Sequence, residues 1–179
     1  MLACENQIYY LRENVYGAES RSCSFRFEVG KEGLTFYFTV NDKDIISPFE
    51  KDNEDIWQAD AVVVFLSADG KLTSYKEMEV SPYGIRFFAD VTNEDGKTPQ
   101  ICKITPAFEA HVEWTSAGYC VRIFVSFATL GSSDIKKMKF NAYWLDKKAD
   151  RSQLLYALSP TFCESFHRPA YFIGMEAEK

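Results

Sequence analysis

The strongest constraint on the fold of this chain is the alternation of apolar and polar residues in short segments separated by turns. Residues 24–29 (SFRFEV) and 34–40 (LTFYFTV) both alternate with a period of two, and the turn sequence Lys31-Glu32-Gly33 lies between them. A period of two places every second side chain on one face of a β-strand. Two such segments around a short turn predict a β-hairpin.

The same pattern continues through the rest of the chain. Residues 61–66 (AVVVFL) are apolar throughout, which indicates a central strand covered on both faces. Further strands are predicted at 74–80, 85–91, 108–114, 119–127, 139–145, 153–158 and 170–177. Only 127–131 and 133–137 are candidates for a short helical turn. About ten strands with minimal helix predict an all-β fold, a two-sheet antiparallel β-sandwich of the jelly-roll type. The 179 residues fit a single domain spanning 1–179.

Charge and cysteine content argue against several classes of partner. The formal net charge is −6 and no cluster of Lys and Arg is present, so neither nucleic acid nor an anionic membrane is an expected partner. The five cysteines form no CxxC pair, which favours reduced thiols over a zinc site and leaves an oxidised pair open. The first residues do not form a signal peptide. We therefore expect a cytoplasmic protein, or an extracellular domain if the chain is excised from a larger secreted protein.

Residues that could support catalysis are few. His111 and His167 are the only bases available for a nucleophilic triad, and no GxSxG, P-loop or dinucleotide motif is present. Glu77 and Glu79 lie two apart on one strand, whereas a glycosidase needs carboxylates that face each other across a cleft. We therefore expect no enzyme, and a glycoside hydrolase that uses Glu77 or Glu79 remains the third and least favoured interpretation.

The loop over residues 41–55 is rich in carboxylates. Asp42, Asp44 and Asp55 carry the oxygen ligands that calcium prefers, although their spacing is not that of an EF-hand. A solvated acidic loop is the alternative. The sequence therefore requires no cofactor, and it places a structural calcium ion, if one binds, in this loop.

Trp57 lies where this loop meets the apolar strand. A Trp in such a place either packs into the core or offers its ring to the apolar face of a sugar. Tyr75, Glu77 and Glu79 are predicted to share a strand face away from Met78. They would form a solvent-facing polar strip beside Trp57, and such a strip could bind the hydroxyls of a sugar.

Several short blocks occur in an order typical of a known family. They are 34–42 (LTFYFTVND), 56–66 (IWQADAVVVFL), 75–84 (YKEMEVSPYG), Asn141, Ser159-Pro160, 166–169 (FHRP) and 172–174 (FIG). Together they resemble carbohydrate-binding module family 9 from about residue 21 to residue 174. The resemblance implies a β-sandwich that binds sugars, notably the ends of plant polysaccharide chains, between two Trp side chains. It also implies a structural calcium ion in some members.

The chain departs from the family pattern at two positions. The resemblance implies Trp57 as the first of the two Trp residues, but the second falls at Leu158 and a ligand-site Glu falls at Val63. Neither Leu158 nor Val63 can supply the missing contact. The aromatic residues that could replace the second Trp are Tyr83, Tyr156 and Phe162.

The favoured interpretation is a non-catalytic carbohydrate-binding module for a mono- or oligosaccharide or a polysaccharide chain end. The predicted ligand-binding residues are Trp57, Glu77, Arg86, Asn141 and Tyr156. Arg86 is included because it follows the turn after Glu79 and could approach the same patch. The second interpretation is a β-sandwich interaction domain that has lost sugar binding, which the residues Val63 and Leu158 favour.

Overall fold

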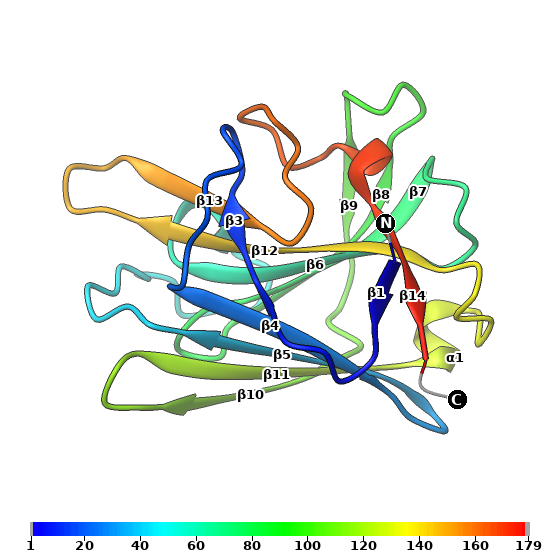
Figure 1. The fold of residues 1–179 in the computed structure, drawn as a ribbon, viewed down its shortest axis with the longest axis horizontal. Helices are drawn as coiled ribbons and strands as arrows, with labels where there is room; N and C mark the ends of the chain where they lie inside the picture. The colour runs from blue at the N-terminus through cyan, green and yellow to red at the C-terminus, as the bar shows by residue number, and fades with distance from the viewer. Residues whose placement is uncertain (1, 178–179) are drawn as a thin grey trace.

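The structure is a computed structural model in which residues 2–177 are described. Two β-sheets make up the molecule (Figure 1). The larger sheet has the order β1 (Leu2–Cys4), β14 (Ile173–Glu176), β12 (Lys139–Lys147), β6 (Ala61–Ser67), β7 (Ser74–Val80), β8 (Arg86–Thr92), β9 (Gln100–Lys103). In this sheet β13 (Gln153–Ala157) pairs with β12 and with β3 (Arg12–Glu13). The smaller sheet has the order β10 (Glu109–Trp114), β11 (Tyr119–Ser126), β5 (Gly33–Val40), β4 (Cys23–Val29), β2 (Tyr9–Tyr10).

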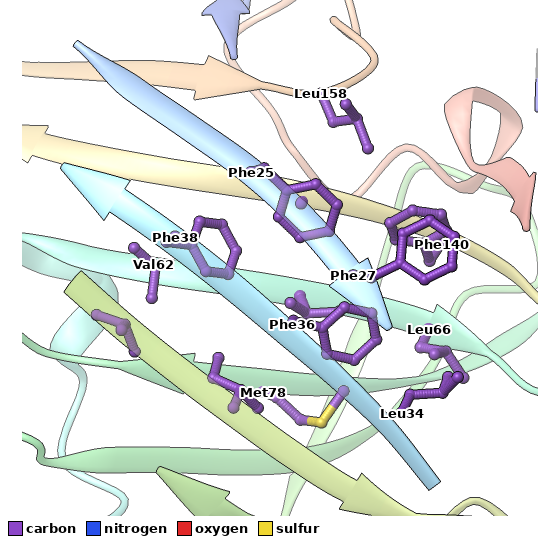
Figure 2. Close-up of a cluster of buried hydrophobic side chains, with 14 of the residues drawn as sticks. Phe25, Phe27, Leu34, Phe36, Phe38, Val62, Leu66, Met78, Phe140 and Leu158 are labelled. Atoms are coloured by element: carbon purple, nitrogen blue, oxygen red, sulfur yellow. The ribbon is translucent and has the colours of Figure 1, made fainter. Parts of the chain in front are cut away.

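The main hydrophobic core lies between the two sheets. The alternating positions of β4 and β5 point into it, and the aromatic side chains of both strands meet β6, β7 and β12 (Figure 2). Its buried aromatic residues include Phe25, Phe27, Phe36, Phe38 and Phe140. The ring centroids of Phe27 and Phe140 lie 5.6 Å apart in an edge-to-face arrangement. This geometry stabilises an aromatic pair by more than the burial of its apolar surface alone. The predicted two-sheet β-sandwich is therefore confirmed.

A second apolar layer covers the outer face of the larger sheet. Val63 and Phe65 of β6 belong to this layer, whereas Val62 and Val64 belong to the main core. The chain segment 159–172, called here the covering segment, packs Phe166 and Phe172 against Phe65 with ring centroids 5.4 and 6.1 Å away. This second layer explains why β6 is apolar throughout, as the sequence predicted for a strand covered on both faces.

The structure differs from the prediction at the chain ends and at one edge of the larger sheet. The short strands β1, β2, β3 and β9 were not predicted, because segments of two to four residues carry too little alternation to detect. The predicted strand 170–177 begins instead with the 3₁₀ helix η2 (Pro169–Tyr171), and β1 pairs with β14 in parallel. Of the two predicted helical turns, 127–131 contains α1 (Phe127–Leu130), whose N-cap is Ser126, while 133–137 has no helix.

Candidate functional site

A cavity of about 250 Å³ opens on the outer face of the larger sheet. It is lined by Trp57, Glu77, Phe87, Ile101, Phe166 and His167. These side chains come from the 3₁₀ helix η1 (Ile56–Gln58), from the adjacent strands β7, β8 and β9, and from the covering segment. The cavity thus has the aromatic rings of Trp57, Phe87 and Phe166 around the polar side chains of Glu77 and His167. Its size suits one small ring-shaped ligand.

Trp57 is held at the cavity by its backbone, while its ring stays accessible. Ile56, the first residue of η1, is fully buried, and the side chain of Gln153 donates to the carbonyl oxygens of Trp57 and Ala59, each over 3.0 Å. The Trp57 side chain remains 42% exposed. Trp57 is therefore not a core residue, and it lies beside Glu77 as the platform interpretation requires.

Glu77 and Glu79 point toward this face but are shielded from solvent. Glu77 is 2% exposed and Glu79 is fully buried. No hydrogen-bond donor among residues 2–177 reaches Oε2 of Glu77 or either carboxyl oxygen of Glu79. Burial raises the pKa of Glu77 to about 7, and burial together with the neighbouring Glu77 raises the pKa of Glu79 well above its usual range. The prediction of a solvent-facing strip was wrong, because the covering segment and the loop before β6 close over it.

His167 connects the cavity to a buried hydrogen-bond network. Its Nε2 lies 3.8 Å from Oε1 of Glu77, and its Nδ1 lies 2.9 Å from the hydroxyl of Tyr75. The Asn93 side-chain amide donates to the Tyr75 hydroxyl over 3.3 Å and to the His167 carbonyl over 3.2 Å. Burial lowers the pKa of His167 to about 4, so the ring is neutral at pH 7. His167 therefore orients polar groups in the cavity without balancing the charge of Glu77.

Asn141 was predicted to contact the ligand, but the structure uses it as a support. It is fully buried, and its Nδ2 donates to the Tyr143 hydroxyl and to the Ser159 carbonyl, both over 2.8 Å. Its Oδ1 accepts from the backbone N–H groups of Ala142 and Ser159. Asn141 therefore fixes the start of the covering segment and is not among the residues that line the cavity.

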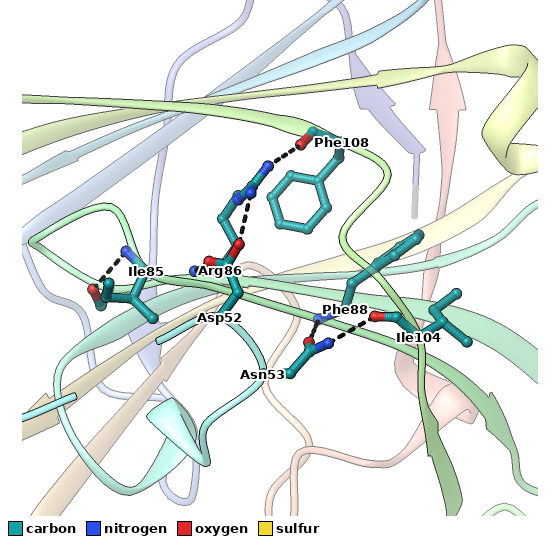
Figure 3. Close-up of polar contacts among 8 residues, drawn as sticks. Asp52, Asn53, Ile85, Arg86, Phe88, Ile104 and Phe108 are labelled. Atoms are coloured by element: carbon teal, nitrogen blue, oxygen red, sulfur yellow. Dashed lines mark hydrogen bonds and ion pairs between the residues drawn. The ribbon is translucent and has the colours of Figure 1, made fainter. Parts of the chain in front are cut away.

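Arg86 was expected near Glu77, and the structure places it elsewhere. On β8 the residues Phe87 and Ala89 face the outer side, so Arg86 projects to the opposite side. Its guanidinium binds Asp52 over 2.6 Å and the Phe108 carbonyl over 3.1 Å (Figure 3). The neighbouring Asn53 binds the backbone of Phe88 and Ile104 (Figure 3). These contacts fasten the acidic loop to β8 and do not form part of the cavity.

Tyr156 also lies away from the cavity. Its ring stacks on Trp144, with centroids 4.8 Å apart, and both belong to the side of the sheet that faces the main core. Leu158 is buried in the same core, and Tyr83 and Phe162 are exposed outside the cavity. The additional aromatic walls are instead Phe87 and Phe166. Sequence reasoning missed them because an aromatic residue in a buried layer has no local mark of a ligand site.

A trio of carboxylates meets at the start of β6. Asp42, Asp60 and Asp146 each place an oxygen within 4.8 Å of the others. Oδ1 of Asp60 accepts from the Lys147 N–H over 2.7 Å, whereas Oδ2 of Asp42 and Oδ1 of Asp146 have no hydrogen-bond partner among residues 2–177. Burial raises the pKa of Asp60 to about 6. The other carboxyl oxygen of Asp146 pairs with Lys148 over 2.6 Å, so the two oxygens without a partner are the hard donors that fit calcium here.

The predicted calcium ligands match this trio only in part. Asp42 belongs to it, whereas Asp44 contributes its backbone N–H to Asp42 Oδ1 over 3.0 Å. Asp55 forms an ion pair with Lys103 over 2.6 Å. Asp60 and Asp146 were missed because they lie outside the acidic loop, and only sheet pairing brings β6 and β12 together.

A larger hollow of about 430 Å³ lies over β7 and β8 near Gly131. Of its charged residues, Lys76 and Asp90 pair with each other and Asp69 pairs with Lys71, and none of its lining side chains is a buried polar group without a partner. The cavity beside Trp57 is therefore the stronger candidate. Among residues 2–177 no helix has the length and apolar character needed to cross a membrane.

Comparison with solved structures shows the same fold in known domains. A candidate carbohydrate-binding protein of Bacteroides uniformis ATCC 8492 matches with a TM-score of 0.77 at 16% identity, over 96% of this chain and 86% of that chain. A family 9 carbohydrate-binding module of Caldicellulosiruptor kristjanssonii in complex with cellotriose matches with a TM-score of 0.67 at 14% identity, over 97% and 84%. The glucose complex from the same organism gives 0.68 at 13% identity, over 97% and 87%.

No curated protein matches this chain. Residues 6–173 match the family model described as carbohydrate family 9 binding domain-like. That match spans most of both sheets and includes the residues that line the cavity. The chain therefore belongs to the carbohydrate family 9 binding domain-like family.

Proposed function

We propose that this domain is a non-catalytic carbohydrate-binding module that holds one sugar ring, at the end of a saccharide, in the cavity beside Trp57. The observation that carries the proposal is the half-exposed Trp57 ring next to a buried Glu77 with an unpartnered oxygen. A pyranose has an apolar C–H face and a rim of hydroxyls, so it needs both an aromatic platform and hydrogen-bond acceptors at its edge.

The roles of the lining residues follow from their positions. The Trp57 ring offers a face to the sugar, and Phe87 and Phe166 complete an apolar wall. Glu77 accepts hydrogen bonds from sugar hydroxyls in a site shielded from water, where an unmade hydrogen bond costs about 1–3 kcal/mol. The Tyr75–His167 contact keeps the imidazole fixed beside that carboxyl.

The same geometry opposes hydrolysis. Glycosidases place two carboxyl groups on either side of the scissile bond. Glu77 and Glu79 are neighbours on one strand, and Glu79 is fully buried and does not line the cavity. The two carboxyls cannot flank a glycosidic bond, which agrees with a binding role.

The second candidate function, an interaction domain, has one observation in its favour. Trp114 and Tyr83 are 49% and 59% exposed, and their ring centroids lie 5.6 Å apart outside the cavity. Exposed aromatic pairs of this kind are common at protein interfaces. Because the patch is separate from the cavity, it serves below as the control for sugar binding.

We also propose that Asp42, Asp60 and Asp146 hold a structural calcium ion. They come from the loop after β5, from the residue before β6, and from β12. The ion would supply positive charge that ties this loop to the larger sheet. Trp57 lies in the same connection between β5 and β6, so the proposed ion would also restrain the cavity wall.

A calorimetric titration series tests the sugar proposal. Glucose, cellobiose and cellotriose are titrated into the protein in turn. Because the cavity accommodates one ring, the affinity should rise by less than about tenfold, or 1.4 kcal/mol, from one ring to three. A steep rise with each added ring would point to an extended groove instead, and the absence of heat with every saccharide would refute the proposal.

A further inference from the structure

The cavity is lined by one carboxyl group, that of Glu77, and a second carboxyl, that of Glu79, is buried next to it. Glu77 and Glu79 are side by side on β7, and three of their four carboxyl oxygens have no hydrogen-bond partner among residues 2–177. The Glu77 carboxyl is the neighbour of Glu79 on the strand, and two carboxyls can share a hydrogen bond only when one of them is protonated. The pair is therefore a buried acid that a hydrogen-bond donor or a positive charge would stabilise.

No charged residue in the described part of the chain balances this pair. The titratable groups near it are Tyr75, His167, Asp55 and Lys103. Tyr75 is uncharged at neutral pH like any tyrosine, and burial raises its pKa further, whereas His167 is uncharged because burial lowers its pKa. Lys103 is already paired with Asp55 over 2.6 Å, so these two charges cancel. Residues 2–177 therefore offer the carboxyl pair no cation that is not already paired.

The apolar lining of the cavity also favours a cation. Trp57, Phe87 and Phe166 present aromatic rings around Glu77. Aromatic faces carry negative electrostatic potential and attract an ammonium group placed within about 6 Å of the ring centre. An ammonium group in this cavity would contact the aromatic ring faces and the Glu77 carboxyl at the same time. A neutral hydroxyl interacts more weakly with both, because it carries no positive charge.

We propose that the cavity prefers a saccharide whose terminal ring carries a protonated amine, an amino sugar such as glucosamine, over the corresponding neutral sugar. This inference rests on the proposed function, because the ring stacks on Trp57 as before and only the substituent differs. The ammonium group donates hydrogen bonds to the Glu77 carboxylate, and charge-assisted hydrogen bonds are about twice as strong as neutral ones.

Binding of the cation is linked to loss of a proton. When the ammonium group enters, the proton on Glu77 leaves to solvent, and the carboxylate that remains pairs with the ammonium. Burial raises the pKa of Glu77 to about 7, so at pH 5 this proton is held and opposes the cation. The affinity for the amino sugar should therefore increase from pH 5 to pH 7, while the amine stays protonated.

The test compares glucosamine, glucose, N-acetylglucosamine and 2-aminoethanol by isothermal titration calorimetry at pH 7 and at pH 5. Glucosamine should bind at pH 7 about tenfold more tightly than glucose, the ratio that one charge-assisted contact gives. N-acetylglucosamine has an uncharged amide in place of the amine and should show no such gain. At pH 5 the preference for glucosamine should shrink toward onefold.

Two variants distinguish an effect of the Glu77 carboxyl from an effect of the overall negative charge of the protein. Glu77→Gln should bring the ratio of the glucosamine and glucose affinities close to one. Glu113→Gln removes an exposed carboxylate on β10 in the other sheet and should leave that ratio unchanged. If Glu77→Gln fails to fold, the pH comparison on the unaltered protein still decides the question.

The outcomes separate the two levels of the proposal. Equal affinities for glucosamine and glucose would overturn the amino-sugar inference and leave the proposed function standing. Binding of 2-aminoethanol as tight as that of glucosamine would overturn it too, because the site would then recognise an amine without its sugar. The absence of binding by every saccharide would overturn both the inference and the proposed function.

Discussion

Glu77 and Glu79 show at the scale of single residues how much the environment decides chemistry. On the sequence they are two carboxylates on an alternating strand, and a solvated strip is the ordinary expectation. In the structure the covering segment and η1 bury them against Phe65 and His167. Sequence reasoning identified Trp57 and Glu77 as ligand candidates because a Trp at a strand entrance and a nearby acidic strand are local features.

His167 and Phe166 could not be assigned in the same way. Their roles depend on which part of the sheet the covering segment reaches, and nothing within a few residues of them encodes that. Arg86 and Tyr156 were predicted near the ligand for want of the same information about distant contacts. Shifting by one residue along a strand moves a side chain to the other face of the sheet, and both residues fall on the face away from the cavity.

The first prediction concerns the pH dependence of stability at Glu77. Its pKa is raised to about 7 by burial, so between pH 4.5 and 7 the folded state holds a proton that the unfolded state releases. The free energy of unfolding should therefore fall as pH rises through this window. Glu77→Gln stays neutral and should show a smaller fall, because only Glu79 of the pair still titrates.

Denaturant unfolding of the wild type and of Glu77→Gln at pH 5 and pH 8 measures the difference directly. The comparison with the variant is needed because other groups titrate in the same range. The lowered pKa of His167 has the opposite effect and the raised pKa of Asp60 the same effect, and both are common to the two proteins. Identical pH profiles would show that Glu77 is not shielded in solution.

At the scale of elements, the covering segment is what turns a sheet face into a cavity. Its start is fastened by Asn141, which makes hydrogen bonds to both the N–H and the C=O of Ser159. Its middle packs Phe166 and His167 on Phe65. The sequence predicted the strands on either side of this segment well, because strand alternation is local, but the path of a long loop depends on contacts between distant residues.

The second prediction is that Asn141→Ala loosens the cavity without touching the ligand. The Ser159 backbone groups would lose their partner in a partly buried place, at a cost of up to about 1–3 kcal/mol for each unsatisfied group. Amide hydrogen exchange over residues 159–172 should become faster, and saccharide affinity should fall. Unchanged exchange in this segment would mean that Asn141 does not fix it.

The third prediction concerns calcium at the trio of Asp42, Asp60 and Asp146. An ion that binds only the folded state stabilises it by mass action, and about 100-fold excess over Kd corresponds to a rise in Tm of about 5–10 °C. Asp60→Asn should abolish this rise. The exposed control Glu94→Gln should keep it. Equal melting temperatures with calcium and with a chelator would refute the proposed calcium site.

At the scale of the whole molecule, the main core and the proposed sugar site lie on opposite faces of the larger sheet. The inner face shares the aromatic core with the smaller sheet (Figure 2), and the outer face carries the cavity beside the covering segment. The sequence predicted this division in part, because β6 is apolar on both faces. It could not predict that the second face is only partly filled, since a cavity is a property of several segments together.

This separation gives the fourth prediction, that changes in the core affect folding and not recognition. Phe140 contacts the rings of Phe25, Phe27 and Phe36. Phe140→Ala should lower the free energy of unfolding by about 3–5 kcal/mol. Below its melting temperature the variant should still bind saccharide with wild-type affinity in calorimetry. Loss of binding in the folded variant would show that the two faces are coupled.

The most direct test of the account compares saccharide binding by Trp57→Ala and Trp114→Ala in one calorimetric experiment. The two rings are 42% and 49% exposed, so their removal should change stability by similar small amounts, well under the 3–5 kcal/mol or so of a buried aromatic. If the cavity beside Trp57 is the sugar site, Trp57→Ala abolishes binding and Trp114→Ala retains wild-type affinity. Retained binding in Trp57→Ala, or its loss in Trp114→Ala alone, would contradict the account and place recognition on the Tyr83–Trp114 surface.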